Sequence, residues 1–190
     1  SGGHEMIAID MDGVLADFVH GFTSLGHRLF GRPVYSAHWA TSWDMTWYAE
    51  QRQLDRIWED VAASNSFWSS LPPLVSEHTF ERLYKAVDKG KVLFVTTRPG
   101  KTAIQQTQKW LQYYLGHGCR PTVIVTQDKR RLIGPYRVMS VADDNPTQWV
   151  PLCPDRIFMP KWSYNALWHD LATPTPDPDS AVTEALRLTK

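Results

Sequence analysis

Two aspartates stand two residues apart near the N-terminus, directly after a short apolar run. The segment MIAIDMDGVLADF (residues 6–18) places Asp10 and Asp12 where the run ends, and Gly13 follows. Because side chains alternate along an extended chain, both carboxylates lie on one side of it. Such a pair suits Mg²⁺, which prefers oxygen ligands, or phosphoryl transfer with one carboxylate as nucleophile and the other as acid and base. A bare D-x-D also matches an ordinary strand end with solvated aspartates, so the pair alone does not decide the chemistry.

Two further runs of apolar and β-branched residues also end in polar side chains. KVLFVTT (91–97) ends with Thr96 and Thr97, whose hydroxyls and neighbouring backbone N–H groups suit a phosphate. PTVIVT (121–126) is followed by Lys129, which offers a positive charge to phosphoryl oxygens. Each feature alone also fits a structural role, as a buried Thr pair or a solvated lysine.

A fourth run, YRVMSVADD (136–144), ends with the acidic pair Asp143 and Asp144, and a weaker fifth run, DRIFM (155–159), follows it. An acidic pair also serves as an ordinary turn cap. Each of the four polar strand ends, taken alone, can be explained by a structural role. One active site accounts for all four together, because parallel strands bring their carboxyl ends to the same edge of a sheet.

The runs are separated by segments that are long enough for helices. In KTAIQQTQKWLQYYLG (101–116), the apolar residues fall roughly at helical spacing. Apolar runs separated by helices indicate a parallel sheet that is covered on both faces. The sequence therefore predicts an α/β fold, a doubly wound, Rossmann-like parallel sheet.

A long insert separates the first two runs and predicts a small helical cap. We expect a catalytic core at residues 1–17 and 77–172, a helical cap at 18–76, and a Pro-rich tail with a short terminal helix at 173–190. Asp17, just before the insert, is expected at a hinge or at a helix start.

Composition limits the class of protein. The chain has 190 residues, of which 43% are hydrophobic, so it can build a core and is not expected to be disordered. The 20 basic and 20 acidic residues balance, which does not favour a long nucleic acid as partner. The two cysteines suit a reducing compartment, and no apolar run reaches membrane-spanning length, so a cytoplasmic protein without membrane contact is expected.

The ordered set of Asp pair, Thr, Lys and Asp pair resembles the haloacid dehalogenase (HAD) superfamily of phosphatases over about residues 6–165. More narrowly, DMDGVLADF (10–18), TQDK (126–129) and ADD (142–144) are similar to the 5'(3')-deoxyribonucleotidase family. TTRP (96–99) and TQKWL (107–111) resemble bacterial and phage members of that family.

The resemblance implies roles for the acidic residues. Asp10 would be the nucleophile that forms an aspartyl-phosphate, and Asp12 would protonate the leaving oxygen and later deprotonate the attacking water. Mg²⁺ would be held by Asp10, by the backbone carbonyl of Asp12 and by Asp144, with Asp143 in contact through a water or a second layer of ligands.

The resemblance also implies a phosphate and substrate site. Thr96 or Thr97 would bind phosphate together with Lys129, and Arg98 would contact phosphate or sugar or pair with the cap. Phe18 would meet the substrate, because the family also carries Phe after the first motif. Asn165 would brace the active-site loop. The remaining cap aromatics fit either base stacking or a cap core: Trp39, Trp43, Trp47, Trp58, Phe67 and Trp68.

The expected function is a Mg²⁺-dependent phosphomonoesterase, a 5'(3')-(deoxy)ribonucleotidase acting on nucleoside monophosphates. The alternatives are a 3'-phosphatase on nucleic-acid ends, a HAD phosphatase for another small phosphomonoester, and a non-catalytic nucleotide-binding protein of the same fold. The sequence leaves the oligomeric state open, a homodimer included.

Overall fold

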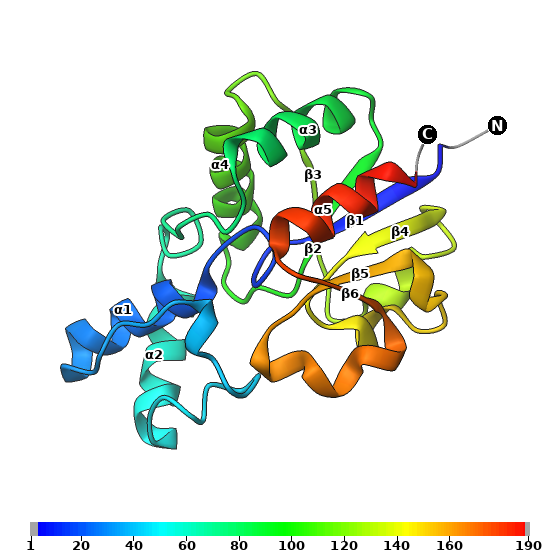
Figure 1. Ribbon diagram of the computed structural model, residues 1–190. Coiled ribbons are helices and arrows are strands. Elements are labelled where there is room, and N and C mark those ends of the chain that lie inside the picture. The colour runs from blue at the N-terminus through cyan, green and yellow to red at the C-terminus, as the bar shows by residue number, and fades with distance from the viewer. Residues whose placement is uncertain (1–3, 189–190) are drawn as a thin grey trace.

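The structure is a computed structural model that describes residues 4–188 (Figure 1). Its centre is one six-stranded sheet with the order β3-β2-β1-β4-β5-β6, in which every neighbouring pair is parallel. The strands are β1 (Met6–Asp10), β2 (Val92–Thr96), β3 (Thr122–Val125), β4 (Val138–Ala142), β5 (Ile157–Pro160) and β6 (Thr173–Thr175). The predicted Rossmann-like α/β fold is confirmed, and the strand order reverses beside β1, where such sheets place their ligands.

Five α-helices connect or flank the strands. They are α1 (Phe18–Phe30), α2 (Gln51–Ala63), α3 (Glu77–Asp88), α4 (Ala103–Leu115) and α5 (Pro178–Arg187). Five 3₁₀ helices complete the described chain: η1 (Ala37–Trp39), η2 (Lys129–Leu132), η3 (Pro146–Trp149), η4 (Pro154–Arg156) and η5 (Ser163–Leu171). None of the helices between residues 4 and 188 has the length and apolar character that crossing a bilayer requires.

The two faces of the sheet are covered differently. Ile7, Ile9 and Phe94 belong to a cluster that includes buried residues of α3, α4 and α5. Ala8 and Leu93, one residue out of phase, belong to a second cluster, to which the 3₁₀ segments contribute. This alternation is the period of two that an extended strand imposes, and it explains why the strands are apolar throughout.

Helices α1 and α2 lie away from the sheet, beyond the carboxyl end of β1 (Figure 1). Two adjacent segments join this part to the rest: the backbone N–H of Asp17 donates to the Pro72 carbonyl at 2.8 Å, and that of Leu74 donates to the Leu15 carbonyl at 2.8 Å. The Asp17 carboxylate also accepts from the backbone N–H of His20 and so caps α1. Asp17 therefore stands both at a helix start and at the crossing between the two parts.

The C-terminal segment, expected as a Pro-rich tail with a short terminal helix, also contains a strand. Residues 173–175 form β6, with Pro174 paired beside Met159 of β5, and α5 then packs on the sheet with Ala181, Val182 and Ala185 fully buried. Proline is tolerated at a sheet edge, where its missing N–H faces outward. A Pro-rich composition is therefore compatible with an edge strand, which was not predicted from the sequence here.

Candidate active site

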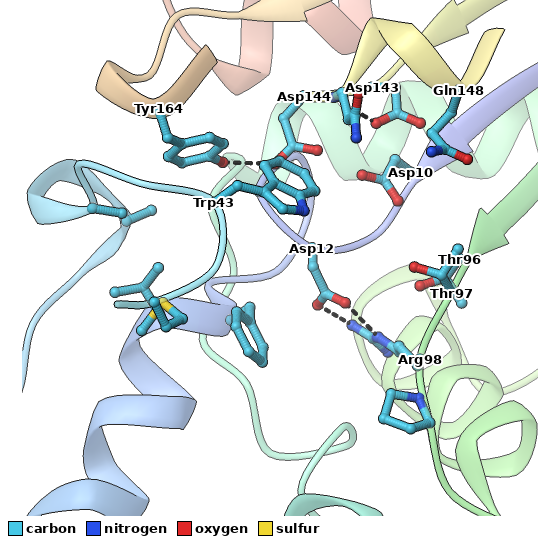
Figure 2. Close-up of a pocket in the computed structure, with 18 of the residues that line it drawn as sticks. Asp10, Asp12, Trp43, Thr96, Thr97, Arg98, Asp143, Asp144, Gln148 and Tyr164 are labelled. Carbon is cyan, nitrogen blue, oxygen red and sulfur yellow. Dashed lines mark hydrogen bonds and ion pairs between the residues drawn. The ribbon is translucent and has the colours of Figure 1, made fainter. Parts of the chain in front are cut away.

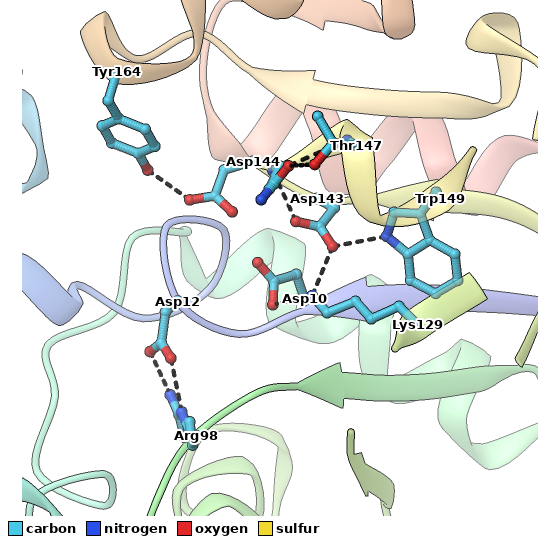
Figure 3. A network of polar contacts seen from close by, with 10 residues as sticks. Asp10, Asp12, Arg98, Lys129, Asp143, Asp144, Thr147, Trp149 and Tyr164 are labelled. Atoms are coloured by element: carbon cyan, nitrogen blue, oxygen red, sulfur yellow. Dashed lines mark hydrogen bonds and ion pairs between the residues drawn. The ribbon is translucent and has the colours of Figure 1, made fainter. Parts of the chain in front are cut away.

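A buried ion-pair cluster lies at the carboxyl end of β1 (Figure 3). The Lys129 ammonium is 3.1 Å from Asp10 Oδ1 and 2.8 Å from Asp143 Oδ2. Asp10 is the last residue of β1, Lys129 begins η2 after β3, and Asp143 directly follows β4. Residues more than a hundred positions apart in the sequence are thus brought together because parallel strands end at one edge.

Three carboxylates share this position. One oxygen from each of Asp10, Asp143 and Asp144 lies within 4.8 Å of the others, and all three residues are buried. Asp144 Oδ1 is buried and has no hydrogen-bond partner. Three buried carboxylates exceed the single ammonium of Lys129, and a buried negative charge needs a compensating cation. The site therefore fits a divalent cation with oxygen ligands.

The pKa values of the cluster reflect this excess of negative charge. Burial and the nearby Asp143 carboxylate raise the pKa of Asp10 to about 7, although Lys129 opposes the shift. Burial, Asp10 and Asp143 also hold the pKa of Asp144 well above its ordinary value. Burial lowers the pKa of Lys129, but the Asp10 and Asp143 carboxylates outweigh it and raise that pKa. A bound cation would favour the ionised carboxylates.

Asp143 is held on both of its oxygens. Its Oδ1 accepts from the backbone N–H of Asn145 at 2.9 Å, and its Oδ2 accepts from the Trp149 indole N–H at 2.8 Å as well as from Lys129. The side chain of Asp143 is nearly inaccessible, at 1% exposure. Its three donors therefore fix Asp143 as the inner member of the acidic cluster.

Asp144 is oriented from the opposite side. The Tyr164 hydroxyl donates to Asp144 Oδ2 at 2.6 Å, and the Asn165 side-chain amide donates to the Asp144 carbonyl at 3.1 Å and to the Pro160 carbonyl at 2.9 Å. Both residues lie in η5, after β5. Asp144 Oδ1 is thus left buried without a hydrogen-bond partner.

Gly13 creates the space that Asp144 occupies. Its φ is +81°, and a Cβ at this position would lie 2.0 Å from Asp144 Oδ2 and 2.7 Å from the Tyr164 hydroxyl oxygen. The Gly13 carbonyl also accepts from the Trp162 indole N–H at 2.8 Å. The glycine after D-x-D is therefore required both by the backbone conformation and by the close approach of Asp144.

Asp12 points away from this cluster, toward Arg98 (Figure 3). Arg98 Nε donates to Asp12 Oδ2 at 3.0 Å, and Nη2 donates to Asp12 Oδ1 at 2.8 Å. The Arg98 side chain is 0% exposed, whereas that of Asp12 is 25% exposed. The carboxylate therefore lies between the guanidinium and the open site.

The two threonines after β2 differ in environment. Thr96 is buried and ends the strand, whereas Thr97 is exposed, and both line the pocket beside Asp10 (Figure 2). The geometry thus brings both candidates to the site that the sequence predicts for them.

A pocket of about 280 Å³ opens above the cluster, and residues from the sheet edge and from the segment 18–76 line it together (Figure 2). Phe18 lies in its wall and stacks on Trp58 and on Trp68, with ring centroids 5.4 and 5.9 Å apart. Trp43 also lines the pocket and is half exposed. The pocket lining does not include Trp39, Trp47 or Phe67.

Several residues at the site were not predicted from the sequence. Tyr164, Trp149 and Thr107 contact the predicted residues through their side chains, although no role was assigned to any of the three from the sequence. Tyr164 could have been predicted, because it directly precedes Asn165, for which a role was predicted. Thr107 begins the stretch TQKWL (107–111), which carries part of the family resemblance, but the position of Trp149 gives no such signal.

Comparison with known proteins agrees with this geometry. The family model described as 5' nucleotidase, deoxy (pyrimidine), cytosolic type C protein (NT5C) matches residues 4–172. A solved structure described as a beta-phosphoglucomutase from Thermotoga maritima superposes with a TM-score of 0.57 at 16% identity, covering 94% of this chain and 97% of that one, which supports the shared fold. A search of curated proteins gives no match. The chain is a phosphomonoester hydrolase of the HAD type, and it belongs to the cytosolic type C 5'-nucleotidase family.

Proposed function

We propose that the protein is a Mg²⁺-dependent 5'(3')-nucleotidase that hydrolyses nucleoside monophosphates, deoxyribonucleotides among them, through an aspartyl-phosphate on Asp10. One observation carries the proposal: the buried Asp10 carboxylate lines a pocket that also contains hydroxyl and ammonium groups and the aromatic rings of Phe18, Trp58 and Trp68. Aromatic faces stack on nucleobases, and the buried polar groups suit the phosphate.

In the first step, an Asp10 oxygen attacks phosphorus and the bond from phosphorus to the ester oxygen breaks. Asp12 gives its proton to that oxygen, so the nucleoside leaves as an alcohol. In the second step, Asp12 takes a proton from a water molecule, which attacks phosphorus and breaks the acyl-phosphate bond. Inorganic phosphate leaves, and the Asp10 carboxylate and the proton on Asp12 are restored.

The other residues of the site would bind the phosphate and the metal ion and neutralise their charges. Lys129 would hold the Asp10 carboxylate and meet phosphoryl oxygens, and Thr96 or Thr97 would donate to the phosphate. Asp10, Asp144 and the Asp12 carbonyl would hold Mg²⁺, with Asp143 behind them, and the ion would offset the charge of the transferring phosphoryl group. The unpartnered Asp144 Oδ1 supports this assignment.

The test is a panel of phosphomonoesters with wild type and with Asp10→Asn. We expect turnover of nucleoside monophosphates by wild type, reversible loss on chelation of Mg²⁺, and at least about 10³-fold lower kcat in Asp10→Asn, because the nucleophile is removed. The matched control is Asp55→Asn, at an exposed aspartate of α2 that accepts from the Gln51 side-chain amide, which should stay within about twofold. Unchanged kcat in folded Asp10→Asn would exclude the covalent route.

A second comparison separates the substrate classes. Wild type should hydrolyse dUMP well and a 3'-phosphorylated oligonucleotide poorly, because the segment 18–76 walls the pocket and limits it to small ligands. Preference for the oligonucleotide would favour end repair, and binding of nucleotide without turnover would favour a non-catalytic role.

A further inference from the structure

Arg98 lines the pocket beside the proposed phosphate site, but its guanidinium group is already engaged by other residues. It is fully buried behind Asp12, and each of its nitrogen atoms already has an acceptor: Nε and Nη2 donate to Asp12, and Nη1 donates to Thr107 Oγ1 at 2.9 Å. A phosphate that accepted from Nε and Nη2 would have to displace Asp12 from a two-point ion pair. The pair is a strong, geometrically specific interaction.

The guanidinium is also fixed on its flat face. Its central carbon lies 4.6 Å from the centroid of the Trp68 ring, and the Thr107 hydroxyl in turn donates to the Ala103 carbonyl of α4 at 2.7 Å. Trp68 is itself immobilised, because its indole N–H donates to the Pro99 carbonyl at 3.0 Å and its backbone N–H to Gln106 Oε1 at 2.7 Å. Arg98 is therefore held by its contacts with Asp12, Thr107 and Trp68.

The ion pair with Arg98 still allows Asp12 to act as acid and base. A carboxylate offers about four lone-pair sites, and the guanidinium fork takes one on each oxygen. The Asp12 side chain is 25% exposed and lines the pocket, so its remaining lone pairs are accessible to a ligand there. The Arg98 guanidinium thus fixes the orientation of the Asp12 carboxylate. It leaves lone pairs on both carboxylate oxygens free to exchange a proton.

We propose that Arg98 is a positioning residue that aims Asp12 at the ester oxygen and at the attacking water, and not a ligand of the substrate phosphate. The inference rests on the proposed function, since it needs Asp12 as acid and base. Trp68, which stacks on both Arg98 and Phe18, ties this positioning to the aromatic wall of the pocket.

The test compares Arg98→Met and Arg98→Lys with wild type, measuring kcat and KM for a nucleoside monophosphate and the inhibition constant of inorganic phosphate. We expect about 10²-fold lower kcat in Arg98→Met, because small misplacement of a catalytic group costs about that much, with KM and the phosphate constant within about threefold. Arg98→Lys should recover part of kcat, because it restores the charge but not the fork. Thr107→Val, which removes one anchor, should cost less than Arg98→Met.

A double variant makes the test specific. Adding Arg98→Met to Asp12→Asn should lower kcat by less than about threefold further, because Arg98 acts through Asp12. The control is Arg56→Met, at an exposed arginine that pairs with Asp60 on α2, which should match wild type.

Three results would overturn the inference: a tenfold or greater rise in the phosphate constant with kcat unchanged, full additivity with Asp12→Asn, or wild-type kcat in Arg98→Met. If Arg98→Met does not fold, Arg98→Lys and Thr107→Val carry the same comparison. Absence of turnover in wild type would instead reject the proposed function, so the two failures are distinct.

Discussion

The Tyr164 hydroxyl donates a 2.6 Å hydrogen bond to Asp144 Oδ2, while Asp144 Oδ1 is buried without a partner. One oxygen of the carboxylate is thus fixed by the protein, and the other is available to a ligand. Tyr164 also packs edge-on against Trp43, with ring centroids 5.3 Å apart, and Trp43 belongs to the inserted segment. The orientation of a predicted metal ligand is therefore tied to a side chain that walls the pocket.

Removing this hydroxyl should weaken cation binding. We expect Tyr164→Phe to raise the dissociation constant for Mg²⁺ or Mn²⁺ by about tenfold, because residues that orient a ligand typically contribute 10- to 100-fold. Calorimetric titration of the metal-free protein measures this without any turnover. Tyr113→Phe, at a tyrosine that is 72% exposed, is the control. Equal affinity in both variants would mean that the hydroxyl does not orient the carboxylate toward a metal.

Gly13→Ala should disrupt the acidic cluster as well as strain the backbone. The added Cβ would meet Asp144 Oδ2 at 2.0 Å, and the φ of +81° also disfavours alanine. Gly31→Ala is a matched control, because its φ is +66° but nothing lies within 4 Å of the added Cβ.

Both variants should lose about 1 kcal/mol through the backbone, and only Gly13→Ala should lose cation binding as well. Chemical denaturation and metal titration measure the two effects. Retained cation affinity in Gly13→Ala would show that Asp144 can move aside without cost to the site.

Gln106 joins the returning end of the inserted segment to α4. Its side chain accepts from the Trp68 backbone N–H at 2.7 Å and donates to the Ser64 carbonyl at 2.8 Å, and Gln106 is buried. Gln106→Leu leaves both backbone groups without a partner, so we expect a loss of about 2–4 kcal/mol in the free energy of unfolding. Gln112→Leu, at a less buried glutamine of the same helix with one bond to the Cys119 carbonyl, should cost less. An equal loss in the two variants would contradict this account.

Asp179 makes the free energy of unfolding depend on pH. Burial alone would raise the pKa of Asp179, but hydrogen bonds from Thr79 and from both the backbone and the hydroxyl of Ser76 lower it on balance. Because the folded-state pKa is lowered, the stabilisation is present above the ordinary value of about 4 and is lost as the pH falls through the folded-state pKa.

Asp179→Asn should therefore be less stable than wild type near neutral pH, by about 1 kcal/mol, and the difference should shrink as the pH falls below about 4. Urea denaturation at a series of pH values measures it, with Asp155→Asn at an exposed aspartate as the control. A difference that grows toward low pH would have the wrong sign for this mechanism.

The sequence alone determined which residues meet at the sheet edge. Asp10, Lys129 and the pair Asp143–Asp144 follow apolar runs, and parallel strands must bring such positions together. A helix start at Asp17, which caps α1, was one of the two roles expected for that residue, because a side-chain oxygen at this position can accept from the first turn. These features depend on short-range patterns and on one topological rule.

The tertiary structure decided where the side chains point. That Asp12 faces Arg98, that Tyr164 fixes Asp144, and that a Pro-rich tail supplies β6 all depend on contacts between distant segments. No pattern within one segment encodes them, because the direction of a side chain is set by the partners that packing places beside it. The sequence therefore identified the chemistry of the site, and the fold assigned each group its orientation.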